Sequence, residues 1–192
     1  MDDLYNNKYR IDTARLKSWD YSADGYYFVT ICTKNRECYF GRITDAKMVL
    51  SEIGYVIFEE WTYLFSNHSH TKTDEWIIMP NHLHAIIIIE NSQNVSQSHI
   101  EKETSRWGKE MSRWDVSTRL KPNSLGSIIG QFKSRATKRL WNEGYEHFAW
   151  QLRFYDHIIR NERELLKIRE YIRYNPINWH EDEENPYISS CQ

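Results

Sequence analysis

The chain has 192 residues, of which 40% are hydrophobic, and its formal net charge is −2. This length and composition fit one domain with a sizeable core and are too small for two comfortable domains. The small negative charge excludes a protein whose whole surface is basic enough to coat nucleic acid. Cys32, Cys38 and Cys191 are odd in number and lack CxxC spacing, so we expect neither a disulfide framework nor a structural zinc site.

The sequence shows no sign of membrane insertion. No apolar run approaches the roughly 20 residues of a membrane span. The N-terminal residues Met1 to Tyr5 lack the basic and apolar regions of a signal peptide. We therefore expect a cytoplasmic protein without membrane contact.

The first part of the chain predicts an extension, a strand and a helix. Residues 1–25 are polar and show no clear period, so we interpret them as an N-terminal extension. Residues 26–33 are β-branched and aromatic, which favours a strand. From Leu50 to Leu64 apolar residues recur at spacings of three and four, which predicts an amphipathic helix.

A hairpin with paired histidines is predicted next. The apolar runs 76–79 and 83–89 are separated by the turn signal Pro80-Asn81 and predict two antiparallel strands. His82 and His84 begin the second strand, and strand alternation points both imidazoles to one face, about 7 Å apart along the strand. Two such imidazoles can share a divalent metal, although histidines near a turn are more often ordinary packing residues. The apolar strands around this pair favour a metal site, because buried polar groups need partners.

The second half of the chain predicts two helices around a strand. The polar residues 91–123 are interpreted as a mobile insertion. Ser124 can cap a helix that continues to Leu140 and ends near Gly144. Residues 147–159 alternate as a last strand.

Asn161, with Glu164 at the third helical position, can cap a final helix that Pro176 stops. The element order is then βαββαβ followed by a helix. This order predicts an α+β ferredoxin-like antiparallel sheet with helices on one face and an added C-terminal helix.

Two groups of polar residues are candidates for function. Residues 116–142 contain basic residues and no acid, a pattern that fits phosphate contacts about as well as a solvated helix face. On the final helix, Tyr171 and Asn175 lie one turn apart on one face, next to the apolar stripe. If that face meets the histidines, a phenol and an amide oxygen converge with them. The alternative is that Tyr171 is one of the 13 tyrosines that merely pack.

Several ordered blocks together resemble the REP-associated tyrosine transposases of the single-tyrosine HUH superfamily. The resemblance spans about residues 26–179, and residues 180–192 form an acidic tail outside it. The blocks that carry it are Met79-Pro-Asn-His-Leu-His84, residues 126–138, Trp150-Gln-Leu-Arg-Phe-Tyr-Asp-His-Ile-Ile-Arg160, and Tyr171-Ile-Arg-Tyr-Asn-Pro176.

The resemblance implies a role for individual residues. His82 and His84 match the metal-binding histidines, Tyr171 matches the catalytic tyrosine, and Asn175 stands at the position of a polar third metal ligand. The remaining matches are an acidic-His pair expected to orient a ligand, Asp156 and His157. The candidates for DNA backbone contacts are Lys133, Arg135, Lys138, Arg139, Arg153 and Arg160. Exposed tryptophans that could stack on unpaired bases are Trp19, Trp107 and Trp114.

The implied activity is metal-dependent cleavage and rejoining of single-stranded DNA next to a hairpin, through a 5′-phosphotyrosine. Imidazole and amide ligands completed by water and phosphate oxygens suit Mg²⁺ or Mn²⁺. We expect no small-molecule cofactor and a monomer rather than a homodimer.

Two other functions stay open. The first is a domesticated protein that binds hairpin DNA without cleaving it. The second is a metal-dependent hydrolase in which the histidines activate water and Tyr171 only packs.

Overall fold

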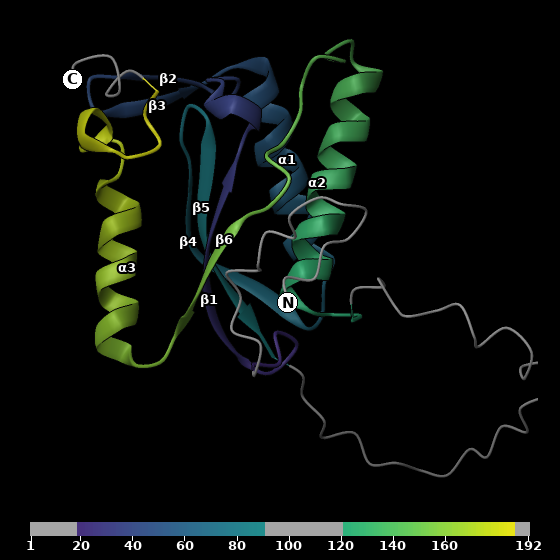
Figure 1. Cartoon of the computed structure of the whole chain (residues 1–192), viewed down its shortest axis with the longest axis vertical. Helices are drawn as coiled ribbons and strands as arrows, with labels where there is room; N and C mark the ends of the chain where they lie inside the picture. The colour runs from purple at the N-terminus through teal and green to yellow at the C-terminus, as the bar shows by residue number, and fades with distance from the viewer. Residues whose placement is uncertain (1–18, 91–120, 187–192) are drawn as a thin grey trace, which may run out of the picture.

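The computed structural model describes residues 19–90 and 121–186 (Figure 1). Most of the predicted N-terminal extension, most of the predicted 91–123 insertion and the end of the acidic tail lie outside the described residues. Trp107, Trp114 and Cys191 lie outside them as well.

A four-stranded antiparallel sheet forms the centre of the protein. Its order is β4-β5-β1-β6, and its strands are β1 (Gly25–Cys32), β4 (Thr71–Ile78), β5 (His82–Ile89) and β6 (Tyr155–Ile159). The two strands richest in apolar residues, β1 and β5, occupy the middle, where both faces of the sheet are covered. This order is the ferredoxin-like topology predicted from the sequence.

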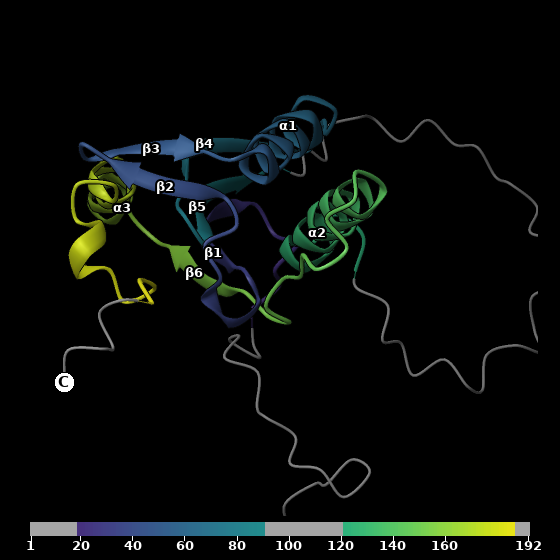
Figure 2. The same cartoon turned by 90° about the horizontal axis from the view of Figure 1, so that it is seen from above.

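Helices cover both faces of the sheet. Figures 1 and 2 show α1 (Glu52–Ser66) and α2 (Leu125–Asn142) together on one face and α3 (Glu162–Tyr174) on the other. The predicted caps Ser124 and Asn161 are confirmed, and Ser51 caps α1 in the same way: each side chain accepts a hydrogen bond from a backbone N–H of the first turn. The helices begin where they do because these caps satisfy N–H groups that the helix itself leaves unpaired.

Each face of the sheet has its own apolar cluster. Alternate residues of β1, including Val29 and Ile31, pack with α1 and α2 in the larger cluster. Phe28, on the opposite side of β1, packs with Ile86 and Ile172 in a smaller cluster under α3. The strand alternation that places Val29 on one side therefore places Phe28, and with it Thr30, on the side of α3.

Two elements differ from the sequence prediction. A short hairpin of β2 (Gly41–Thr44) and β3 (Lys47–Leu50) precedes α1 and was not predicted. Its turn residues Asp45 and Ala46 both have positive φ, and an alanine there carries none of the usual Asn-Gly or Asp-Gly signal.

The predicted strand 147–159 is too long, because only β6 joins the sheet. Residues 147–154 form a loop in which Trp150 makes a single bridge to Thr33. The carbonyls of Gln151 and Arg153 accept hydrogen bonds from the Lys133 side chain, so a side chain takes the place of a strand partner there.

None of the helices in the described residues is both long and apolar enough to span a bilayer.

Candidate metal and tyrosine site

His82 and His84 lie at the start of β5, on the face of the sheet that α3 covers. Their cross-strand partners on β1 are Cys32 and Thr30. Both imidazoles are buried, and their ring centres are 4.4 Å apart. The two rings therefore lie next to each other on one face of the sheet, as their spacing of two residues along a strand predicts.

The hydrogen bonds of Asn81 determine which nitrogen of His82 is free. The Asn81 amide nitrogen donates to the carbonyls of Arg36 (3.0 Å) and Glu184 (2.7 Å), so its Oδ1 must face the other way. That oxygen lies 2.9 Å from His82 Nδ1 and can only accept, which places the imidazole proton on Nδ1. His82 Nε2 is then left with its lone pair, and it is buried without a hydrogen-bond partner.

His84 contacts a threonine on one side and the tyrosine of α3 on the other. Its Nδ1 lies 2.9 Å from Thr30 Oγ1, and its Nε2 lies 3.1 Å from the hydroxyl of Tyr171. When Thr30 accepts the Nδ1 proton, Nε2 carries the lone pair that a metal needs. The rings of Tyr171 and Phe28 also pack edge to face, with their centres 6.0 Å apart, and this contact helps to hold the phenol next to the imidazole.

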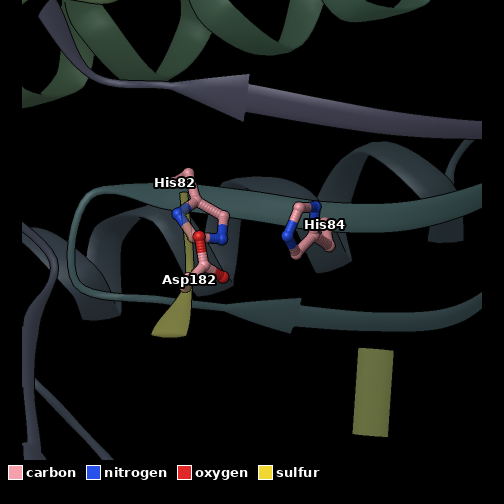
Figure 3. Close-up of side chains that lie close together, drawn as sticks. All are labelled: His82, His84 and Asp182. Carbon is pink, nitrogen blue, oxygen red and sulfur yellow. The ribbon is translucent and has the colours of Figure 1, made fainter. Parts of the chain in front are cut away.

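Asp182 completes the group. One ligand atom from each of His82, His84 and Asp182 lies within 4.8 Å of the others. Figure 3 shows the carboxylate of Asp182 next to both imidazoles. Asp182 follows the short helix η2 (Trp179–Glu181), which carries the chain from α3 back over the site. No role was predicted for this acid, because it stands in a run of four acids that was interpreted as a tail.

Asn175 lies at the C-terminal end of α3, between the tyrosine and this carboxylate. Its side-chain nitrogen donates to Asp182 Oδ2 at 2.9 Å, and its Oδ1 is buried without a hydrogen-bond partner. The structure thus brings the predicted ligand Asn175 to the site and places a second oxygen donor, Asp182, next to it. Its assignment as a metal ligand stays a prediction.

Burial sets the protonation of the site. Burial and, to a lesser extent, the positive charge of Arg36 lower the pKa of His82 to about 3. Burial also holds the pKa of His84 well below its usual value, and the neighbouring His82 adds to this effect. Burial raises the pKa of Tyr171 to about 12, and the Asp182 charge adds to this rise. The imidazoles are therefore neutral and able to bind a cation at neutral pH, while the phenol is protonated.

The donor atoms present fit a divalent metal. His82 Nε2 and Asn175 Oδ1 are two buried polar atoms without hydrogen-bond partners, and such atoms are costly unless something binds them. They lie next to the Asp182 carboxylate. Two imidazole nitrogens with carboxylate and amide oxygens form a mixed donor set that suits Mg²⁺ or Mn²⁺.

The predicted pair Asp156 and His157 separates across the sheet. The side chain of His157 shares the α3 face with Phe28 and contacts Glu164, with Nε2 2.7 Å from Oε1. Asp156 pairs with Val29, whose side chain faces α1 and α2. His157 therefore ties β6 to the first turn of α3, the helix that carries Tyr171. A role of Asp156 and His157 in orienting a ligand stays a prediction.

The structure does not bring the basic residues of α2 to the tyrosine, because α2 covers the opposite face of the sheet (Figure 2). Arg135 and Arg139 form ion pairs with Glu60 on α1. Arg139 is further paired with Glu59 and Glu143.

The other candidates for DNA contact are distributed over loops and α2. Lys133 binds loop carbonyls, Lys138 is exposed on α2, and Arg160 is exposed just before α3. Trp19 donates its indole N–H to the Tyr27 hydroxyl. DNA contact by any of these residues, and by Arg153, stays a prediction.

Comparison with known proteins finds a relative by sequence and similar folds among solved structures. No protein-family model matches the sequence. A protein of uncharacterised function from Haemophilus influenzae is 35% identical over 170 residues, which make up 88% of this chain and 89% of that protein. The two proteins belong to one family.

The fold of this family is found in a solved transposase. The structure of a REP-associated tyrosine transposase bound to a REP hairpin matches with a TM-score of 0.53 and 16% identity, covering 86% of this chain and 74% of that one. A protein from Deinococcus radiodurans, classed provisionally as a transposase, matches with a TM-score of 0.38 and 10% identity over 84% of this chain and 96% of that one. The first match confirms that this family shares the fold of the REP-associated tyrosine transposases.

Proposed function

We propose that this protein is a metal-dependent endonuclease and strand transferase that acts on single-stranded DNA next to a hairpin. The observation that carries the proposal is the contact between the Tyr171 hydroxyl and His84 Nε2, 3.1 Å apart, within the group of His82, His84 and Asp182. A tyrosine next to a pair of imidazoles that can hold a cation is the arrangement that tyrosine-mediated phosphoryl transfer needs. The fold shared with a transposase that binds a REP hairpin supports the choice of hairpin DNA as substrate.

The ligands would be His82 through Nε2, His84 through Nε2 and a carboxylate oxygen of Asp182. Asn81 and Thr30 hold the two imidazoles in the required tautomers from behind. Asn175 orients Asp182 and offers its own Oδ1 as a further donor. When bound, the cation would polarise the scissile phosphate and offset the charge that develops on it.

Tyr171 supplies the nucleophile in this proposal. Its oxygen forms a bond to phosphorus, the bond from phosphorus to the 3′ oxygen breaks, and the products are a 5′-phosphotyrosine and a free 3′-hydroxyl. Because the phosphodiester bond energy is kept in the tyrosine ester, a 3′-hydroxyl can attack it and rejoin the strand. In the arrangement seen here, the phenol proton faces His84 Nε2, so the first requirement for attack is that this proton leaves a group whose pKa is about 12.

A single chain provides all these groups. Tyr171 contacts His84 of its own chain, and α3 is held to β4 of the same sheet by ion pairs from Arg169 and Arg173. This arrangement supports the proposal that the protein acts as a monomer.

A denaturing gel tests the proposal. Purified protein is incubated with labelled single-stranded hairpin DNA and Mg²⁺ or Mn²⁺, and a covalent adduct is expected with the wild type and not with Tyr171→Phe. Tyr174→Phe is the matched control, because Tyr174 lies on the same helix and is similarly exposed. Cleavage without an adduct would favour the water-activating hydrolase instead. Hairpin binding without cleavage would favour the domesticated binding protein.

A further inference from the structure

A loop with an exposed leucine is hydrogen-bonded to the end of β1, where Cys32 pairs with His82. Leu152, in the loop between α2 and β6, is 95% exposed. The pocket beside it is lined by the loop and by the turn that follows β1, with Lys34 and Arg36 as its charged residues. We call these residues the Leu152 surface: Lys34, Asn35, Arg36, Ala149, Trp150, Gln151 and Leu152.

The loop is held in place by hydrogen bonds on both sides of Leu152. Lys133 Nζ donates to the carbonyls of Gln151 (2.8 Å) and Arg153 (3.1 Å), the two residues that flank Leu152. The backbone N–H of Gln151 donates to the carbonyl of Cys32, at the end of β1. Burial lowers the pKa of Lys133 to about 8, so the protein places a poorly solvated ammonium group under this loop. Leu152 therefore projects from a backbone that is anchored on both sides.

The Leu152 surface is continuous with the site of Tyr171. The side-chain nitrogen of Asn81, which orients His82, donates to the carbonyl of Arg36. Arg36 in turn forms an ion pair with Glu184, two residues after the proposed ligand Asp182. DNA whose phosphate lies at Tyr171 would thus have its neighbouring nucleotides within reach of this surface.

The chemistry of the surface fits a nucleic acid at a stem boundary. An exposed lysine suits a phosphate. A leucine that is 95% exposed on an anchored backbone can insert between two neighbouring bases. Entry costs least where the neighbouring bases are already unpaired, since less stacking is lost there. If the single strand of a hairpin lies at Tyr171, the last base pair of its stem lies next to unpaired bases, and the base step there is of this kind.

We propose that the Leu152 surface docks the junction between the duplex stem and the single strand of the DNA. Leu152 enters the base step at that junction, and Lys34 contacts a neighbouring phosphate. This inference rests on the proposed function, because it takes the same DNA as substrate.

The test uses the full-length protein and a hairpin oligonucleotide with 2-aminopurine at the last stem position. Binding of the wild type is expected to raise the fluorescence of this base about twofold, as the base becomes unstacked. Leu152→Ala should abolish the rise and weaken binding on the order of tenfold, while Leu152→Met, which keeps an apolar tip, should keep both. Leu166→Ala, an exposed leucine in the first half of α3, is the matched control and should behave as the wild type.

The charge contribution is tested through the salt dependence of binding. Lys34→Gln should reduce the slope of log K against log salt by about one unit, whereas Lys167→Gln on α3 should leave it unchanged. Unchanged fluorescence and affinity in Leu152→Ala would overturn the inference, as would an unchanged slope in Lys34→Gln.

The two proposals fail in different ways. Adduct formation on an unstructured single strand uses Tyr171 and the proposed metal ligands but not the Leu152 surface, so Leu152→Ala should keep the wild-type rate there. If Leu152→Ala binds hairpins as the wild type does while both proteins still form the adduct, only the docking surface is wrong. If the wild type neither binds the hairpin nor forms an adduct, both proposals are wrong.

Discussion

The hydroxyl of Tyr171 lies 3.1 Å from Nε2 of His84, so the proposed nucleophile contacts the nitrogen that is proposed to hold the metal. One lone pair cannot accept a phenol proton and bind a cation at the same time. Tyr171 must therefore turn away from His84 before both can act in one reaction. The side chain has room to do so, because it is 47% exposed and lines an open pocket.

We expect Tyr171→Phe to bind Mn²⁺ at least as tightly as the wild type. The substitution removes the hydroxyl that occupies His84 Nε2 and leaves the other donor atoms unchanged. Titration calorimetry with Mn²⁺ measures this directly, and Tyr174→Phe is the control. A Tyr171→Phe protein that binds Mn²⁺ more weakly would show that the phenol helps to hold the metal rather than competing with it.

Asp182→Asn is expected to weaken Mn²⁺ binding about 10- to 100-fold, because it replaces an anionic oxygen donor with a neutral one. Glu183→Gln removes a charge from the adjacent residue and should have a much smaller effect. The comparison separates a ligand from a general electrostatic contribution of the acidic segment. Equal losses in the two variants would contradict Asp182 as a ligand.

Asn81→Ala should lower the free energy of unfolding by about 2–4 kcal/mol. The substitution removes the acceptor of the His82 proton and the donors to the carbonyls of Arg36 and Glu184, all in a buried place. Urea unfolding monitored by fluorescence measures the change. Asn67→Ala, which removes an exposed bond to a helix carbonyl, should cost about 0.5 kcal/mol or less.

The ion pair between Arg169 and Asp74 should hold the tyrosine helix on the sheet. Asp74 lies in an irregular part of β4 that is out of register with β5, and its Oδ2 accepts two hydrogen bonds from Arg169 (2.9 and 2.6 Å). A double-mutant cycle with Asp74→Ala and Arg169→Ala should give a coupling of about 1 kcal/mol in unfolding. Both single variants should also slow adduct formation without weakening Mn²⁺ binding. A cycle without coupling would show that the apolar cluster alone positions α3.

The contact of His157 with Glu164 predicts a pH-dependent contribution to stability. The backbone N–H of Arg160 and the His157 ring lower the pKa of the Glu164 carboxyl below its usual 4.5. A carboxyl with a lowered pKa stabilises the fold above its unfolded-state pKa and loses this effect as pH falls through the folded-state value.

Glu164→Gln should accordingly lower the thermal midpoint by about one or two degrees at pH 7. The difference from the wild type should shrink as pH falls below 4.5. Glu162→Gln, in the same helical turn, is the control and should show a smaller change. A difference that stays constant down to pH 3 would contradict the role of the Glu164 charge.

Local patterns in the sequence predicted most elements of the ferredoxin-like sheet and which candidate residues share one face of a strand or helix. The spacing of His82 and His84 on an apolar strand was sufficient to place both imidazoles on one face, since strand periodicity does not depend on the rest of the fold. The caps Ser124 and Asn161 likewise act within one turn of their own helices. The i, i+4 spacing of Tyr171 and Asn175 placed them together for the same reason.

Only the tertiary structure decided what met these residues. Asp182 reaches the histidines because the chain turns back toward β5 at η2. A run of acids has no periodicity that could predict such a turn. Ion pairs with α1 engage the basic residues Arg135 and Arg139, which a count of charges along one helix cannot reveal. Contacts between residues close in sequence follow from backbone geometry, whereas contacts between distant segments depend on how whole elements pack, and the proposed site requires both.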